Sequence, residues 1–116
     1  MTPRPAIYDC WVWHRSSADG RSAAEKEFTG LPAVAQARLW QKMNKFLTGS
    51  YSPRDVDNLG DGILEIRVKL GSNPYRVIFC CDGRRCVVLT AFHKKDQRTP
   101  KKDLDRAKVR RRTWGQ

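Results

Sequence analysis

The sequence predicts a small α+β domain with an antiparallel, curved sheet of about four strands, N-terminal helices on one face and a basic C-terminal helix. Three observations carry this prediction. Residues 62–95 contain three strand-like runs separated by two tight turns. Residues 32–49 place apolar side chains at helical spacing. The 116 residues, 40% of them hydrophobic, suffice for one core. We expect a single domain over residues 1–116, in which residues 1–6 form a flexible arm.

The N-terminal part predicts a strand followed by a short helix. Aromatic and β-branched residues dominate Ile7–Trp13, as is typical of a strand. After a polar loop, Ser22 and Glu25 have the spacing of a capping box. This predicts a helix over Ser22–Thr29 that ends at Gly30.

A longer helix is predicted between Pro32, in its first turn, and Gly49, just beyond its end. One apolar stripe marks its buried side: Ala35, Leu39, Met43, Phe46 and Leu47. Residues 50–60 are predicted to form a polar loop that leads to the central strands.

The first central strand alternates, which predicts one apolar face and one charged face. Its apolar residues are Leu64, Ile66, Val68 and Leu70, and its charged residues are Glu65, Arg67 and Lys69. Residues 71–74 and Asp82-Gly83 predict the two turns that make the strands antiparallel neighbours. A final helix is predicted over Pro100–Arg112, with Thr99 as its N-cap.

The formal net charge of +11 and the pI near 10.0 predict a polyanionic partner. Residues 94–112 hold ten Lys or Arg against three Asp, so the basic charge gathers in the C-terminal part. No apolar run approaches the roughly 20 residues that a membrane span requires, and the N-terminus lacks a signal-peptide core. We therefore expect a cytoplasmic protein without a membrane partner.

The four cysteines lack the paired spacing of a zinc site, which favours reduced thiols in a cytosol. A disulfide between Cys81 and Cys86 across the second turn remains an alternative. Nucleotide-binding and metalloprotease motifs are absent from the sequence, so no cofactor and no metal are expected.

The charged face of the central strands is the candidate site. Arg67, Lys69 and Arg76 are expected to crowd one concave surface, because antiparallel neighbours lie close together. His93, Lys94 and Lys95 follow at the end of the next strand.

Such a cluster suits the cleavage of RNA by attack of a 2′-hydroxyl on the adjacent phosphate, which needs a base, an acid and cations. A lysine among other cations loses its proton more readily, so Lys69 or Lys95 is a candidate base. Glu65 is either another base or an ion-pair partner of Arg67 or Arg76. A mechanism with two histidines is doubtful, because His14 follows the first strand at a loop.

The segments EFTGLPAVAQARL, LGDGILEIRVK, YRVIF and LTAFHKKDQRTPKKDLDRA resemble the phage-derived HigB branch of the RelE/ParE toxin superfamily over about residues 20–114. The resemblance implies a microbial RNase fold and a toxin that cleaves translated messenger RNA in the ribosome. It also implies a cognate helix-turn-helix antitoxin that is similar to HigA. The toxin would bind DNA only indirectly, as part of the complex with this antitoxin.

Carried over by motif, the resemblance places Arg67 and Lys69 on two basic strand residues of the active site, Arg76 on a phosphate-contacting arginine and Lys95 on a basic residue after the last strand. The stacking tyrosine of RelE has no equivalent, since Lys101 or a neighbour stands there. Phe92 or His93 is left to stack, and His93 is the preferred general acid. The expected RNA contacts are Glu65, Phe92, Lys94, Arg98, Lys101, Lys102 and Arg106.

Two other functions stay open. ParE-type members of the superfamily inhibit DNA gyrase without cleaving RNA, and a degenerate member would only bind nucleic acid. The basic cluster favours RNA cleavage, but likeness of fold does not decide among these functions.

Overall fold

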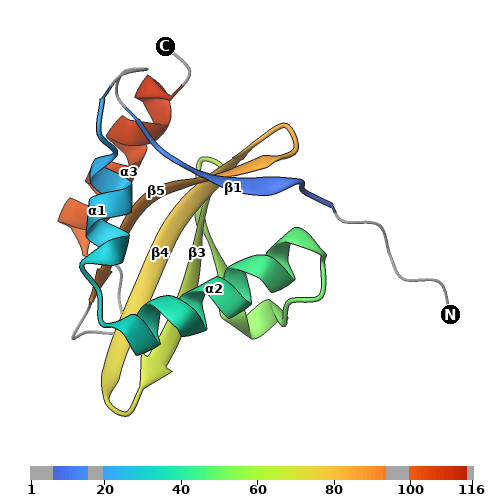
Figure 1. Ribbon diagram of the computed structural model, residues 1–116. Coiled ribbons are helices and arrows are strands. Elements are labelled where there is room, and N and C mark those ends of the chain that lie inside the picture. The colour runs from blue at the N-terminus through green and yellow to red at the C-terminus, as the bar shows by residue number, and fades with distance from the viewer. Residues whose placement is uncertain (1–6, 16–19, 94–99, 115–116) are drawn as a thin grey trace, which may run out of the picture.

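A computed structural model describes residues 7–15, 20–93 and 100–114 of the chain, with a five-stranded sheet between two layers of helices (Figure 1). In chain order the elements are β1 (Cys10–Trp13), α1 (Ala23–Thr29), α2 (Ala33–Leu47), the 3₁₀ helix η1 (Pro53–Asp55), β2 (Val56–Gly60), β3 (Ile63–Leu70), β4 (Asn73–Asp82), β5 (Arg85–His93) and α3 (Lys101–Thr113).

The strand order is β1-β5-β4-β3-β2, with β2 to β5 antiparallel and β1 parallel to β5. The α+β class is confirmed, and the sheet has one strand more than the predicted four. The additional strand β2 lies where a polar loop was predicted. Asp61 and Gly62 join it to β3, and both have positive φ, 54° and 76°, as a type I′ hairpin turn requires.

The other two hairpins also close over two residues. Gly71 and Ser72 join β3 to β4, and Gly83 and Arg84 join β4 to β5. The turn expected at Asp82-Gly83 is therefore shifted by one residue, because Asp82 pairs with Arg85 as the last residue of β4.

The strand predicted over Ile7–Trp13 is shorter than expected, since β1 begins at Cys10. Residues 7–9 bond elsewhere: the Ile7 N–H donates to the Leu47 carbonyl at the end of α2 (2.9 Å), and the Asp9 N–H donates to the Arg84 carbonyl (2.7 Å). The segment before β1 is thus held between α2 and the tip of the β4–β5 hairpin.

The ends of the helices follow the predicted signals closely. The Ser22 hydroxyl accepts from the Glu25 N–H (3.0 Å), which confirms the predicted cap of α1. Pro32 and Pro100 each stand one residue before the helix, at the N-cap, rather than in the first turn. Thr99, the predicted cap of the last helix, lies outside the described residues.

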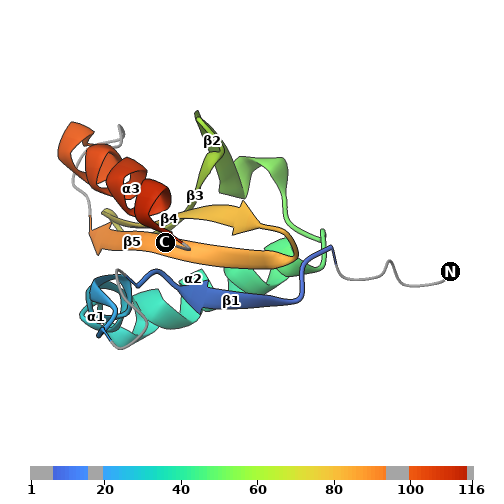
Figure 2. The same ribbon diagram turned by 90° about the horizontal axis from the view of Figure 1, so that it is seen from above.

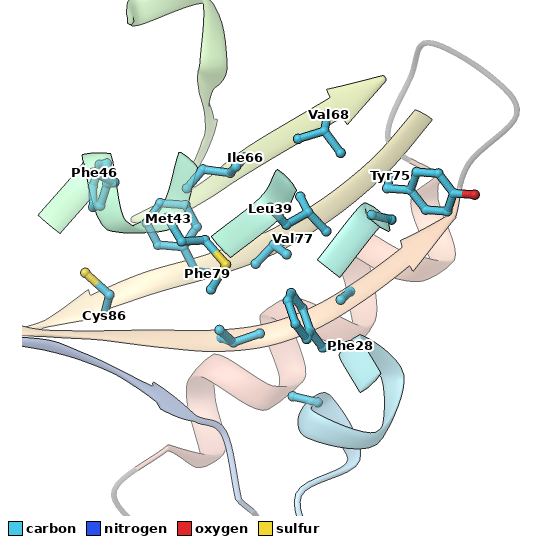
Figure 3. Packing of buried hydrophobic residues seen from close by; sticks show 14 residues of the cluster. Phe28, Leu39, Met43, Phe46, Ile66, Val68, Tyr75, Val77, Phe79 and Cys86 are labelled. Carbon is cyan, nitrogen blue, oxygen red and sulfur yellow. The ribbon is translucent and has the colours of Figure 1, made fainter. Parts of the chain in front are cut away.

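The larger core lies between the sheet and the layer of α1 and α2. Figure 3 shows Phe28, Leu39, Met43 and Phe46 of the helices packed against Ile66, Val68, Val77 and Phe79 of the strands. The apolar stripe predicted for α2 is confirmed for Ala35, Leu39, Met43 and Phe46, which are all buried.

A second core lies on the opposite face, which the sequence predicted to be charged and open. There α3 packs against β4 and β5, and Figure 2 shows it across the sheet from α1 and α2. Ile63, Ile78, Val87 and Leu89 meet Ala107 of α3 in this cluster. The N-terminal helices on one face are confirmed, but the expectation that the opposite face is only charged is wrong, because α3 and this apolar cluster cover part of it. Among the described residues, no helix is long and apolar enough to cross a membrane.

The apolar stripe of α2 predicts a large difference between two substitutions in the same helix. Leu39 is fully buried and Val34 is 60% exposed. We expect Leu39→Ala to lower the free energy of unfolding by about 2–5 kcal/mol, because it leaves a cavity. Val34→Ala should change it by no more than about 0.5 kcal/mol. Urea denaturation followed by circular dichroism measures both; equal losses would contradict the packing described here.

Candidate functional site

Three of the predicted site residues form a cross-strand row on the face that carries α3. In the register of the sheet, Arg67 of β3 lies opposite Arg76 of β4, and Arg76 lies opposite Phe92 of β5. The expectation that the hairpin of β3 and β4 brings Arg67 and Arg76 together is confirmed. Phe92 is half-buried and packs against the cluster under α3.

The middle of this row is not open to solvent. Arg76 is only 3% exposed, and its Nη1 donates to both carboxylate oxygens of Glu65, at 3.1 and 3.3 Å. Glu65 is 1% exposed. Of the roles considered for Glu65, that of an ion-pair partner of Arg76 is the one observed. The expectation that Glu65 and Arg76 lie on an open outer surface is wrong, because both side chains are buried.

Arg67 and Lys69 remain accessible. The Arg67 guanidinium makes an ion pair with Asp57 of the neighbouring strand β2 (2.9 Å), and both side chains are 41% exposed. Lys69, near the end of β3, is exposed. Within the described residues, these two are the cations of the predicted cluster that a polyanion can reach.

Lys69 also lines a cleft of about 240 Å³ between α2 and β3 that the sequence analysis missed. Three further cations line it: Arg38, Lys42 and Lys45. Lys42 donates to Asp55 (2.8 Å) and to the Arg67 carbonyl (2.9 Å), so the cleft adjoins the candidate site. The signal for it was present in the sequence, since the polar side of α2 carries cations and no acidic residue.

The two histidines lie apart from the cross-strand row. His93 pairs with Tyr75 in the register, and their rings lie 4.7 Å apart on the face of α1 and α2. The expected convergence of His93 with Arg67 and Arg76 is wrong, because side chains alternate between faces along β5 and Phe92 takes the position beside Arg76.

His14 is 2% exposed, and its Nε2 lies 3.0 Å from the Thr113 hydroxyl. Burial lowers the pKa of the His14 imidazole below its ordinary value, and the nearby Arg110 guanidinium lowers it further. His14 is therefore a buried, neutral side chain that joins β1 to the end of α3.

The first turn of α3 supplies more exposed charge. Lys101 and Lys102 are exposed. Arg106 instead forms an ion pair of 3.0 Å with the nearly buried carboxylate of Asp103. Lys94, Lys95 and Arg98, which were predicted to belong to the site, lie outside the described residues.

The far end of α3 is tied to α1. Arg110 donates to both Glu27 oxygens (2.6 and 3.0 Å) and to the Leu89 carbonyl (2.8 Å), and the Thr90 hydroxyl donates to Glu27 (2.8 Å). Leu89 is the residue at which the β4–β5 register shifts. Arg110 thus binds the carbonyl of the residue at the register shift, and this ties the basic helix to β5 and α1.

Comparison with known proteins agrees with this architecture. Residues 26–112 match the family described as "Phage derived protein Gp49-like (DUF891)", and the chain belongs to this family. It is 38% identical over 112 residues to the protein named probable endoribonuclease HigB1 in two strains of Mycobacterium tuberculosis, CDC 1551 / Oshkosh and ATCC 25618 / H37Rv. The match covers 97% of this chain and 90% of each relative.

The fold is that of the toxin RelE. A structure of E. coli toxin RelE in the free state, in a variant with two arginines replaced by alanine, superposes with a TM-score of 0.62. The sequence identity is 16%, and the match covers 91% of this chain and 98% of that one. The microbial RNase fold expected from the sequence is thereby confirmed.

The buried ion pair predicts that Arg76 and Arg67 differ in their effect on stability. Arg76→Ala removes the buried cation that pairs with Glu65, and we expect it to cost about 3–5 kcal/mol of unfolding free energy. Arg67→Ala breaks only an exposed pair and should cost about 0–1 kcal/mol. The double variant Glu65→Leu/Arg76→Leu should recover most of the loss. Urea denaturation distinguishes these cases, and a stable Arg76→Ala variant would refute the role of the pair.

The depressed pKa of His14 predicts a pH dependence of stability. Above the ordinary histidine value of 6.5 both the folded and the unfolded states are neutral at this position. As the pH falls below it, the unfolded chain binds a proton that the folded chain resists, so stability is lost. The unfolding free energy of the native chain, relative to that of His14→Gln, should therefore decrease between about pH 7.5 and pH 5. A difference independent of pH would contradict this.

Proposed function

We propose that the chain is the toxin of a type II toxin–antitoxin system and acts as an endoribonuclease on translated messenger RNA. The observation that carries the proposal is the 38% identity to the probable endoribonuclease HigB1, which extends over 97% of the chain. The RelE fold and the net charge of +11 are in keeping with it, since a basic surface attracts RNA.

Arg67 and Lys69 are the proposed catalytic side chains among the described residues. They are exposed cations on one strand, where they can stabilise the charge that develops on phosphate oxygens when the 2′-hydroxyl attacks. The attacking hydroxyl gives its proton to a base, for which Lys69 and Lys95 are the candidates, and the leaving 5′-oxygen takes a proton from an acid. Because this route draws its charge stabilisation from side chains, we propose that it needs no metal ion.

Arg76 is proposed to position Arg67 rather than to touch the phosphate. The two residues are cross-strand neighbours, and like charges so placed repel each other. Glu65 neutralises Arg76 at 3.1 Å, while Asp57 holds the Arg67 guanidinium at 2.9 Å. Arg67 is thereby kept ordered and accessible at the edge of the covered face.

The remaining RNA contacts are proposed on the surface beside these residues. Lys101 and Lys102 are exposed at the start of α3 and would contact the phosphate backbone, which adds affinity without sequence reading. Phe92 is half-buried in the row and is the aromatic side chain proposed to stack on a base. Lys94, Arg98 and Arg106 complete the proposed set.

The partners that follow from this function are the ribosome with its messenger RNA and a HigA-like helix-turn-helix antitoxin, in the cytoplasm. Inhibition of DNA gyrase is the second candidate. It gives no reason for exposed cations at Arg67 and Lys69, which favours RNA cleavage.

Induction of the chain in a bacterial host, followed by mapping of messenger RNA 5′ ends, tests the proposal. We expect new 5′ ends within translated regions. Arg67→Ala and Lys69→Ala should each reduce cleavage about 100-fold or more, as loss of one transition-state contact does. The matched control is Lys26→Ala, an exposed cation on α1 across the sheet, which should cleave normally. If the messages stay intact and a DNA-damage response appears, RNA cleavage is refuted and gyrase inhibition is favoured. Full activity of Arg67→Ala would refute the assigned site.

A further inference from the structure

Two thiols face each other beside the turn of the β4–β5 hairpin. Cys81 and Cys86 are directly opposite in the register, and the next pair, Asp82 and Arg85, closes the two-residue turn. A closing pair exchanges both backbone hydrogen bonds, so the Cys81–Cys86 pair is of the non-hydrogen-bonded type. Cα atoms in such pairs lie about 4.5 Å apart, which is inside the range of about 4.4–6.8 Å for disulfides.

The surroundings make these two thiols unequal. Cys86 is fully buried in the larger apolar core, where Figure 3 shows it at the end toward the hairpin tip. Cys81 is partly exposed. Hydrogen bonds from the Cys86 thiol and the Tyr8 hydroxyl lower the pKa of Cys81 to about 6, against the opposing effect of burial. The same hydrogen bond and burial raise the pKa of Cys86.

Tyr8 holds this arrangement in place. Its ring is stacked on Phe46 at 5.3 Å, and its N–H donates to the Leu47 carbonyl (3.1 Å). Donation to Cys81 raises the pKa of the Tyr8 hydroxyl to about 12. A partly exposed thiol with a lowered pKa therefore lies next to a buried thiol that has the geometry to close on it.

We propose that Cys81 and Cys86 are an oxidant-reactive site, at which a hydroperoxide converts the two thiols into a reversible cross-strand disulfide. The Cys81 thiolate attacks the peroxide, the O–O bond breaks, and the sulfenic acid and one molecule of water or alcohol form after protonation. The Cys86 sulfur then attacks the Cys81 sulfur, the S–S bond forms, and the sulfenic oxygen leaves as water. The two thiols lose two electrons and two protons, and the peroxide is reduced by the same two electrons. A dithiol reverses the step by exchange.

The other two cysteines lack this geometry. Cys80 lies on the opposite face of β4 in the second core, where burial raises the pKa of its thiol to about 11. Cys10 is exposed on β1 and lies opposite Arg85 rather than a cysteine. They serve as matched controls.

The site is separate from the proposed RNA surface. Cys81 and Cys86 lie at the turn end of the β4–β5 hairpin, whereas Arg76 and Phe92 pair toward its open end. Oxidation is expected to act on the docking of Tyr8 and the segment before β1, and to leave RNA cleavage unchanged. The inference does not rest on the proposed function.

The test is treatment of the reduced, full-length chain with hydrogen peroxide near neutral pH, followed by mass spectrometry without reductant. We expect the monomer to lose the mass of two hydrogen atoms and to regain it with dithiothreitol. Trypsin cuts after Arg84 and Arg85, between the two cysteines, so the disulfide should appear as one cross-linked pair of peptides.

Cys81→Ser and Cys86→Ser should each abolish the linked peptides, while Cys10→Ser and Cys80→Ala should retain them. Circular dichroism verifies that each variant is folded, and Cys86→Ala replaces Cys86→Ser if the latter is not. Sulfinic acid on Cys81 without a link, dimers joined through Cys10, or no change in mass in the native chain would each overturn the proposal.

Discussion

The arrangement of the central strands depends on the ion pair between Glu65 and Arg76. Both side chains lie within the sheet, at 1% and 3% exposure, where a single unpaired charge would cost several kcal/mol. Because the two charges neutralise each other across β3 and β4, an apolar cluster and α3 can cover their face. The pair therefore keeps Arg76 inside, while Arg67 and Lys69 of the same face stay accessible.

The same covering explains how a strongly basic helix is held close to basic strands. Lys101, Lys102 and their neighbours bring further positive charge to the face that carries Arg67 and Arg76, and like charges oppose that approach. Apolar contacts of Leu104 and Ala107 offset the repulsion at one end of α3. At the other end Arg110 binds Glu27 and the carbonyl of Leu89 at the irregularity of β5. Contacts on the buried side of α3 thus hold the helix in position. The cations on its exposed side then remain available to bind a polyanion.

Much of the local structure could be predicted from the sequence, because its signals are short-range. The cap at Ser22, the apolar stripe of α2 and the meander of β3 to β5 were predicted correctly, and so was the opposition of Arg67 and Arg76. The strand β2 was missed although Asp61-Gly62 has the same turn chemistry as the recognised Asp82-Gly83. The cations of α2 were not assigned to a site, because the helix was interpreted as a core-packing one. Their cleft with Lys69 depends on how α2 crosses β3.

By itself the sequence determined the identity and order of most elements, the excess of positive charge and the faces that side chains share along a strand, since each of these follows from spacing along the chain. Only the tertiary structure decided which charges are accessible. Alternation places Glu65, Arg67 and Arg76 on one face but carries no information on whether a distant helix covers it. In the folded chain α3 packs on that same face against β4 and β5. Arg76 is buried there beside Glu65, whereas Arg67 stays accessible next to Asp57.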